Sequence, residues 1–237
     1  MHRFFVEPAG DTARITGEDF QHLNRVLRLK PGDAVTLCDG RGTDYEARIA
    51  VIEPDVALCR IHRRQPSPAE PVCQVTLFQC LPKAGKLETI IQKCTELGVH
   101  AIIPTVSHCC TAVPENFSNK LIRFRRVAYE AAKQSRRGMV PRVDEWTSLD
   151  KIDPAAFDLA LIAYEREDAH TLRDVLRDAK TPGSAALIVG PEGGFEPDEA
   201  IRLVSCGAIA VSLGPRILRT ETAGPAMLAQ LLYEVEP

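Results

Sequence analysis

Two short segments of this chain combine residue types that could bind a small ligand at the end of a β-strand. The first segment, residues 190–195, reads GPEGGF and directly follows the apolar run AALIV. Its paired glycines would let the backbone approach a ligand closely or adopt positive φ angles. A simple tight turn would also explain the two glycines, so this segment taken alone leaves both interpretations open.

The second segment, residues 213–222, reads LGPRILRTET and lies between an apolar run and the last predicted helix. Arg219 and Glu221 fall near the expected helix start, where unpaired backbone N–H groups can bind an anion. Ile217 and Leu218 would be costly to expose in a loop unless they line a pocket or an interface. Ligands of parallel sheets bind at the carboxyl ends of the strands, so the two segments together predict one binding site.

Several kinds of site are excluded or weakly supported by the sequence. No Gly-rich dinucleotide fingerprint and no Gly-Lys-Ser/Thr phosphate loop is present, which argues against a nucleotide-dependent dehydrogenase or kinase. The cysteines contain no C-x-x-C pair and mostly lie in apolar runs, where a reduced thiol behaves as a small buried hydrophobe. We therefore expect structural thiols and no metal. Only the adjacent pair Cys109–Cys110 departs from this pattern.

The elements that must position these segments alternate between strands and helices after Pro71. The predicted strands are residues 74–80, 99–106, 158–164, 185–190 and 208–213. The predicted helices are residues 87–97, 117–134, 172–176, 197–206 and 226–234. This alternation predicts an α/β domain with a mainly parallel sheet.

The first part of the chain has a different pattern. Short β-rich runs at residues 3–6, 35–39, 45–52 and 56–62 are separated by turn signals. One helix interrupts them, with Thr16 and Asp19 placed as in a capping box. A small β-barrel with one helix fits this pattern. The proline-rich stretch HRRQPSPAEPV predicts a linker, and hence two domains, 1–70 and 71–237.

The charge distribution favours nucleic acid more than the total charge does. The net charge of −3 speaks against a nucleic-acid binder. Between Lys120 and Arg142, however, the sequence contains many basic residues and a single acidic one, Glu130. The N-terminal part is also rich in arginine. From these two regions we expect RNA contacts from Arg3, Arg25, Arg28, Arg126, Arg136 and Arg137. A solvated helix face is the alternative explanation of the second region.

The composition, with 45% hydrophobic and 26% charged residues, is that of an ordinary globular protein. No apolar run approaches the roughly 18 residues of a membrane span, and the first residues lack the apolar core of a signal peptide. We therefore expect a cytoplasmic protein without membrane contact.

The motifs together resemble a known family. GPEGGF followed by LGPRILRTETA is similar to the signature of the ribosomal RNA small subunit methyltransferase E family, within the SPOUT class of knotted methyltransferases. Further matches are RFF at the start, HLNRVLRLKPGD, DGRG, KLETIIQKCTELGV, and AAKQSRR followed by VP. The resemblance covers essentially the whole chain.

The resemblance implies a fold and a reaction. The expected fold is an N-terminal PUA-like β-barrel that binds RNA, followed by an α/β SPOUT domain with a trefoil knot and a mainly parallel sheet. The expected reaction is methyl transfer from S-adenosylmethionine to N3 of a uridine in small-subunit ribosomal RNA, a step of ribosome biogenesis. The substrate would be that RNA or the assembling small subunit. In the expected homodimer each pocket is completed by the partner subunit.

The resemblance also assigns site residues. Cofactor contact is expected from Ala163, Tyr164, Gly190, Pro191, Glu192, Gly193, Gly194, Leu213, Gly214, Ile217, Leu218 and Arg219. The chain departs from the family where Ser107-His108-Cys109-Cys110 replaces a serine–glutamate–arginine context, where Lys133 replaces a glutamate, and where Arg136 replaces a glycine. These departures leave the cofactor loops intact and put details of RNA contact in doubt.

To methylate N3, the enzyme must position the uracil ring, exclude water and remove the weakly acidic imide proton of N3. Arg219 is the first candidate to stabilise charge on the flanking carbonyl oxygens, and Glu221 to accept the proton or orient Arg219. Either residue could instead form a dimer salt bridge.

A non-catalytic RNA-binding protein of the same fold is the alternative function. In the last helix, Met227, Leu228, Leu231 and Leu232 form an apolar stripe. The pattern fits either a dimer interface or packing on the sheet of its own chain, and the resemblance favours the two-fold dimer interface.

Overall fold

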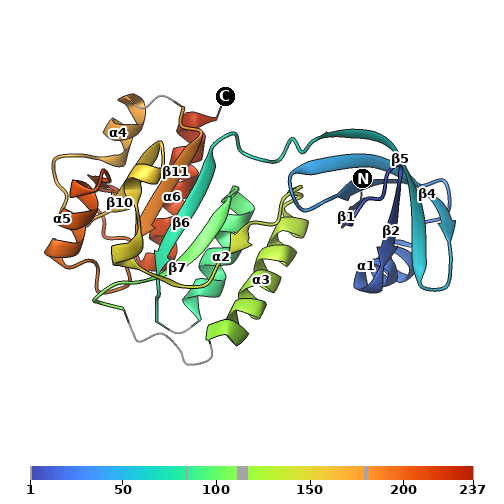
Figure 1. Ribbon diagram of the computed structural model, residues 1–237, viewed down its shortest axis with the longest axis horizontal. Helices are drawn as coiled ribbons and strands as arrows, with labels where there is room; N and C mark the ends of the chain where they lie inside the picture. Colours follow the sequence, from blue (N-terminus) through green and yellow to red (C-terminus); the bar gives the residue numbers. More distant parts are fainter. Residues whose placement is uncertain (1, 84, 111–116, 179–180, 237) are drawn as a thin grey trace. The chain divides into compact units, whose positions relative to one another are not determined.

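The computed structural model describes residues 2–83, 85–110, 117–178 and 181–236. The chain forms two compact units (Figure 1). Unit 1 contains Met1–Glu70 and Ala132–Val140, and unit 2 contains Pro71–Ala131 and Pro141–Pro237. Residues 132–140 therefore belong to the first unit, whereas the contiguous ranges expected from the sequence place them in the second domain.

Unit 1 is built on one curled five-stranded sheet in the order β1-β3-β4-β5-β2. Its strands are β1 (His2–Phe5), β2 (Thr12–Thr16), β3 (Ala34–Cys38), β4 (Thr43–Ile52) and β5 (Val56–Pro66). β1 and β3 pair in parallel, and the remaining pairs are antiparallel. The alternating side chains of these strands bury one apolar face, as in β2, where Ala13 and Ile15 are buried between exposed residues. The sheet is a half-barrel.

The helix of unit 1 differs from its expected form. It begins as α1 (Gly17–Gln21) and continues as the π-helix η1 (His22–Leu27). The Thr16 side chain makes no capping hydrogen bond, so the predicted capping box is wrong. Thr16 instead ends β2, a strand that the sequence analysis missed, and its backbone is committed to pairing with Val56. Phe20 and Leu23 are nevertheless buried against the sheet, as their spacing suggests.

The segment 132–140 is held in unit 1 by two ion pairs. The Arg137 guanidinium, only 2% exposed, lies 2.7 Å from Glu70 Oε2, and the other oxygen of Glu70 accepts the backbone N–H groups of Gly138 and Met139. Lys133, at a position where the resemblance leads one to expect an acid, pairs with Asp19. Both ion pairs join residues far apart in the sequence.

Unit 2 is an α/β unit with a parallel sheet in the order β12-β10-β11-β6-β7-β8, to which β9 adds by pairing with β7. The strands are β6 (Gln74–Cys80), β7 (Ala101–Val106), β8 (Arg142–Val143), β9 (Thr147–Ser148), β10 (Leu159–Ala163), β11 (Ser184–Val189) and β12 (Ile209–Val211). The helices are α2 (Lys86–Leu97), α3 (Phe117–Gln134), α4 (Leu172–Asp178), α5 (Pro197–Ser205) and α6 (Thr220–Val235), with the short 3₁₀ turns η2 (Leu149–Lys151) and η3 (Pro154–Ala156). The end of α3, from Ala132, belongs to unit 1.

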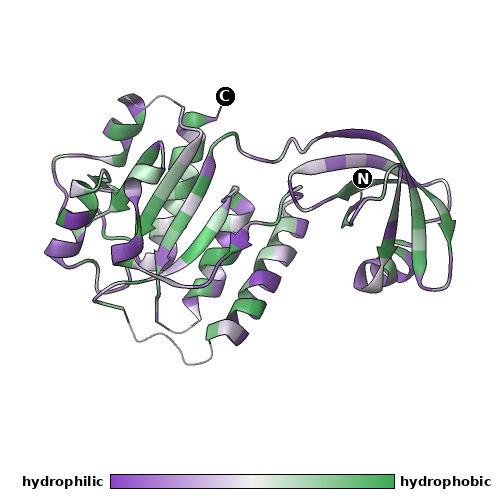
Figure 2. Cartoon of the chain, viewed as in Figure 1, coloured by the Kyte–Doolittle hydropathy of each residue, from purple (hydrophilic) through white to green (hydrophobic). Residues whose placement is uncertain are grey.

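Both faces of this sheet are covered, which explains why its central strands are apolar throughout. On one face Val75, Leu77 and Leu187 pack with residues of α2, α3, α4 and α6. On the other face Phe78 and Ile188 pack against α5 and η2. Figure 2 shows hydrophobic colour along these strands and hydrophilic colour on the outer turns of α4 and α5.

The last helix starts earlier than the apolar stripe suggests. α6 begins at Thr220, with Arg219 as its N-cap, well before the predicted start at residue 226, so Pro225 lies inside the helix. Met227, Leu228, Leu231 and Leu232 are all buried within the core of unit 2. The stripe therefore packs on the sheet of its own chain, and its assignment to a dimer interface is wrong, because these side chains are already covered by their own unit.

The structure confirms the expected fold class, an α/β domain with a parallel sheet preceded by a small β unit. No described helix combines the length and the apolar character that a membrane crossing requires.

Candidate functional site

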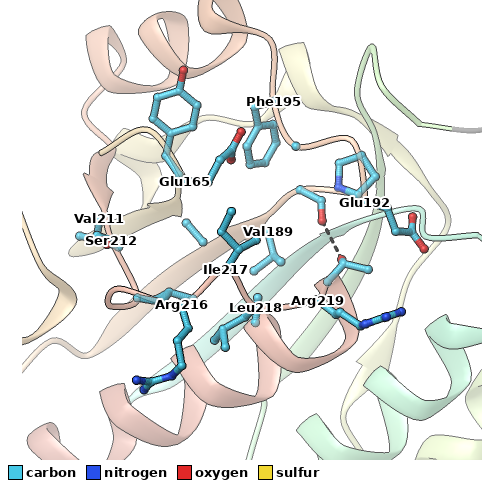
Figure 3. A pocket seen from close by; sticks show the side chains of 18 of the residues that line it. Glu165, Val189, Glu192, Phe195, Val211, Ser212, Arg216, Ile217, Leu218 and Arg219 are labelled. Carbon is cyan, nitrogen blue, oxygen red and sulfur yellow. Dashed lines mark hydrogen bonds between the residues drawn. The ribbon is translucent and has the colours of Figure 1, made fainter. Parts of the chain in front are cut away.

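The candidate site lies where three neighbouring strands of unit 2 end. β10, β11 and β12 run in parallel and finish at Ala163, Val189 and Val211. The segments that follow them surround a cavity of about 680 Å³ (Figure 3). This is the position at which parallel α/β sheets bind their ligands.

Every residue predicted for cofactor contact lines this cavity. The set comprises Ala163 and Tyr164 after β10, Gly190 to Gly194 after β11, and Leu213, Gly214, Ile217, Leu218 and Arg219 after β12. Sequence reasoning missed the other lining residues, which are Lys86, Glu165, Val189, Phe195, Val211, Ser212, Pro215, Arg216, Thr220 and Ala223. Lys86 could have been found, because it starts the helix that follows the carboxyl end of β6.

The conformation of the 190–195 segment requires its glycines. Gly194 has a φ of +71°, and a Cβ there would meet the Glu165 carboxylate at 2.7 Å. A Cβ on Gly193 would meet Cys109 Cβ at 3.1 Å. Gly193 is therefore needed for close approach of the 107–110 segment, a packing contact that the ligand-approach interpretation did not include.

A chain of hydrogen bonds joins three of the elements around the cavity. Gln79, fully buried in β6, donates from Nε2 to Thr220 Oγ1 at 2.9 Å. Thr220, the first residue of α6, donates from Oγ1 to the carbonyl oxygen of Gly190 at 2.7 Å. This chain fixes the start of α6 against the loop that follows β11. It therefore sets the distance between the two segments that form the cavity walls.

Lys86 links two carboxylates at one side of the cavity. Its Nζ lies 2.8 Å from Glu192 Oε1 and 3.1 Å from Glu221 Oε2. Burial alone would raise the pKa of Glu192, but Lys86 and the backbone N–H of Lys83 lower it below its ordinary value. A backbone N–H at the helix start and then Lys86 lower the pKa of Glu221. Both carboxylates are thus held ionised around one ammonium group.

The two predicted catalytic residues occupy different places. Arg219 lines the cavity, and Figure 3 shows it on the Glu192 side, with Arg216 on the opposite side. Glu221 is not among the lining residues; its carboxylate is directed to Lys86. An ionised, paired carboxylate is a poor proton acceptor, so the geometry favours Glu221 as a partner of Lys86.

Two arginines predicted to contact RNA need correction. Arg3 makes a bidentate pair with Asp44, at 2.9 Å and 2.7 Å, and Arg137 is buried against Glu70. Separating a guanidinium from a buried carboxylate partner costs free energy. The positive charge of such a guanidinium is also compensated by the carboxylate, so it attracts a phosphate only weakly. By contrast, Arg25, Arg28 and Arg136 in unit 1 and Arg126 in unit 2 are exposed.

Models of known protein families match most of the chain. An RNA methyltransferase domain matches residues 68–232, and an RNA methyltransferase PUA domain matches residues 15–61. The ribosomal RNA small subunit methyltransferase E of Bacillus subtilis is 34% identical over 250 residues, which covers 100% of this chain and 98% of the relative. The enzyme of the same name from Mycobacterium bovis is also 34% identical and covers 95% of this chain and 88% of its own.

Solved structures agree with these relatives. The ribosomal RNA small subunit methyltransferase E of Neisseria gonorrhoeae, solved with S-adenosyl methionine, has a TM-score of 0.82 at 33% identity and covers 98% of this chain and 96% of its own. A putative methyltransferase from Legionella pneumophila, solved with the same cofactor, has a TM-score of 0.80 at 29% identity and covers 97% and 96%.

Proposed function

Because the chain belongs to the ribosomal RNA small subunit methyltransferase E family, we propose that it transfers a methyl group from S-adenosylmethionine to N3 of a uridine in small-subunit ribosomal RNA. The observation that carries the proposal is the cavity at the carboxyl ends of β10, β11 and β12, lined by all the residues predicted for cofactor contact. The matching RNA methyltransferase domain covers the same part of the chain.

The residues present fit the cofactor. The cavity of about 680 Å³ lies within the roughly 300–1,000 Å³ typical of small-molecule sites. Apolar side chains such as Ile217 and Leu218 suit the flat adenine ring. The carboxylates of Glu165 and Glu192 line the same cavity and suit the positive charge of a sulfonium compound. When bound, S-adenosylmethionine supplies an activated methyl group.

The part of this chain in the reaction is to place the base, exclude water and stabilise developing charge. We assign charge stabilisation to Arg219, which lines the cavity at the N-cap of α6. We assign a positioning role to Glu221, which acts through Lys86 and not as the proton acceptor. Lys86 itself lines the cavity, where its ammonium group holds the carboxylates of Glu192 and Glu221 in place.

The proposal extends to the setting of the reaction. The substrate is the small-subunit RNA or the assembling particle, with unit 1 as the RNA-binding part, supported by its match to a PUA domain. As expected for the family, we propose a cytoplasmic homodimer in which the partner subunit completes each pocket. We also propose that the loops that bind the cofactor form a trefoil knot. Ile217 lines the cavity and is 88% exposed in the single chain, which supports a partner that covers it.

The experiment compares ribosomal RNA from cells with and without the gene, and from in vitro reactions of the pure protein with labelled S-adenosylmethionine. Nuclease digestion and mass spectrometry should find one 3-methyluridine that depends on the gene and is restored by the protein. A methyl group on another atom would contradict the N3 assignment. Absence of cofactor binding in calorimetry would contradict the enzymatic function and leave RNA binding alone.

A further inference from the structure

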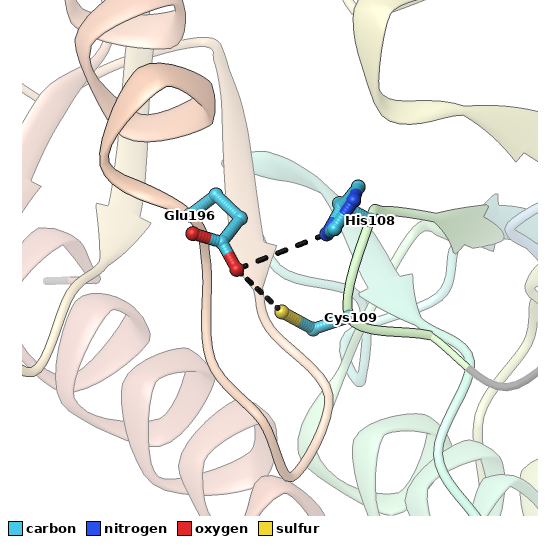
Figure 4. Close-up of side chains that lie close together, drawn as sticks. All are labelled: His108, Cys109 and Glu196. Atoms are coloured by element: carbon cyan, nitrogen blue, oxygen red, sulfur yellow. Dashed lines mark hydrogen bonds and ion pairs between the residues drawn. The ribbon is translucent and has the colours of Figure 1, made fainter.

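A group of possible metal ligands lies outside the cofactor cavity of unit 2. His108 and Cys109 follow β7, and Glu196 precedes α5 (Figure 4). One ligand atom from each residue, Nδ1, Sγ and Oε1, lies within 4.8 Å of both others. These residues include the segment in which the chain departs from its family, and the proposed methyl transfer does not use them.

Two of the three spacings between these atoms are close to those of a tetrahedral site. Cys109 Sγ lies 3.5 Å from Glu196 Oε1, and His108 Nδ1 lies 3.7 Å from the same oxygen. Zinc bonds of about 2.3 Å to sulfur and about 2.0 Å to nitrogen and oxygen give tetrahedral edges of roughly 3.5 Å for S···O and 3.3 Å for N···O. The two contacts of Glu196 Oε1 are thus within a few tenths of an ångström of tetrahedral edges, and the His108 and Cys109 ligand atoms, within 4.8 Å of each other, would have to come to roughly 3.5 Å.

Surrounding contacts hold two of the ligands in place. One oxygen of Glu199 accepts the backbone N–H of His108 at 2.8 Å, and the other accepts the backbone N–H of Glu196 at 3.0 Å. Glu196 and Glu199 form a capping box at the start of α5. Glu199 therefore joins the two segments that carry the ligands, which is the role of supporting groups around bound metals.

The charges also favour a cation. Cys109 Sγ lies against the Glu196 carboxylate and the His108 backbone against that of Glu199, so two negative charges gather at this place. A divalent ion there would offset their mutual repulsion. His nitrogen, thiolate sulfur and carboxylate oxygen form a donor set typical of Zn²⁺.

We propose that His108, Cys109 and Glu196 bind one Zn²⁺ ion, with water in the fourth position. The expectation of no metal rested on the absence of local cysteine pairs, whereas here Cys109 and Glu196 are 87 residues apart. A bound ion would join the segment after β7 to the loop after β11, at the point where Gly193 closely approaches Cys109. Because Gly193 lines the cofactor cavity, the ion would stabilise one wall of that cavity.

The test is a titration of the metal-free full chain with Co²⁺, followed by displacement with Zn²⁺. We expect one equivalent of cobalt to bind with thiolate-to-cobalt charge-transfer absorption in the near ultraviolet, and Zn²⁺ to remove it. Cys109→Ser should abolish the charge-transfer band and weaken Zn²⁺ binding at least about 10-fold. His108→Ala should weaken binding similarly; its exposed side chain makes misfolding a poor explanation of that result.

Cys206→Ser is the matched control, because Cys206 is an exposed free cysteine of the same unit. Its band and affinity should equal those of the unchanged chain. Absence of stoichiometric binding would overturn the proposal, as would a band that survives Cys109→Ser or disappears with Cys206→Ser. The measurement involves neither RNA nor methyl transfer, so its outcome is independent of the proposed enzymatic function.

Discussion

At the scale of single residues, the cofactor cavity depends on a few polar side chains that join its walls. Thr220 and Gln79 connect α6 and β6 to the Gly190 carbonyl, and Lys86 joins the carboxylates of Glu192 and Glu221. These interactions join segments that are distant in the sequence. Substitutions of Thr220, Gln79 or Lys86 should therefore alter the shape of the cavity, although none of the three lies in the glycine-containing segment 190–195.

Thr220→Val keeps the side-chain shape and removes the hydroxyl. The Gly190 carbonyl then loses its donor and the Gln79 amide loses one acceptor in a buried place, which should cost about 1–3 kcal/mol of unfolding free energy. Urea unfolding measures this, and calorimetry should show weaker S-adenosylmethionine binding. Thr222→Val, at an exposed position of the same helix start, is the control. Equal losses in both variants would contradict a special role of Thr220.

Lys86→Met removes the cation between Glu192 and Glu221. Since Lys86 contributes to the lowered pKa of both carboxyls, its stabilising effect is present above their unfolded pKa of about 4.3 and is lost as pH falls through the lower folded values. The stability difference between Lys86→Met and the unchanged chain should thus be largest near neutral pH and shrink below about pH 4. Urea unfolding at several pH values measures it. Lys93→Met, which breaks an exposed pair with Glu96, should show a much smaller effect.

At the scale of elements, α6 has two separate tasks. Its buried side packs against α2 and the sheet, and its first residue positions the loop after β11. On its remaining side, Tyr233 is 86% exposed. Any subunit contact of this helix must therefore use residues outside the apolar stripe.

Leu228→Asp should unfold unit 2 instead of dissociating a dimer. Leu228 is fully buried, and an unpaired carboxylate in the core together with the poorer packing should cost more than about 3 kcal/mol. Circular dichroism and urea unfolding measure the loss. A folded, monomeric variant would show that the stripe lies in a subunit interface after all.

Tyr233→Glu tests the proposed dimer on the exposed side of the same helix. The substitution should leave the unfolding free energy nearly unchanged, because the side chain is exposed. Light scattering should report a shift from dimer to monomer if this side contacts the partner, with methyl transfer falling in parallel because the pocket would be incomplete. An unchanged dimer mass would place the interface elsewhere.

At the scale of the whole molecule, RNA binding should depend on exposed arginines of unit 1. Replacing Arg25, Arg28 and Arg136 by Gln should weaken binding and reduce the salt slope by roughly 0.7–0.9 for each phosphate that is no longer neutralised. Binding isotherms at several salt concentrations measure both. Lys151, Arg173 and Arg177, three exposed cations of unit 2, provide a control with the same change of charge. Equal slopes in the two triple variants would mean that net charge alone accounts for the effect.

The order of the longer strands and helices of unit 2, the family, and most of the residues that line the cavity could be predicted from the sequence, whereas the short strands β8 and β9 were missed. These follow from local information: apolar runs of strand length, helical spacing, and glycines such as Gly194 that only a particular backbone conformation requires. The same local patterns misplaced the start of α6 and missed β2, because pairing with a distant strand and a hydroxyl bond to Gly190 decided those boundaries.

Which polar and apolar groups face solvent depends on contacts between segments that are distant in the sequence. Arg3 and Arg137 have the same side chain as the exposed Arg136, yet each meets a carboxylate that is distant in the sequence. Packing between distant segments likewise determines the burial of the apolar stripe of α6 and the ion pairs of Lys86. It also brings His108 and Cys109 close to Glu196. A linear pattern specifies which face a side chain takes on its own element, whereas burial and partnership depend on what the folded chain places against that face.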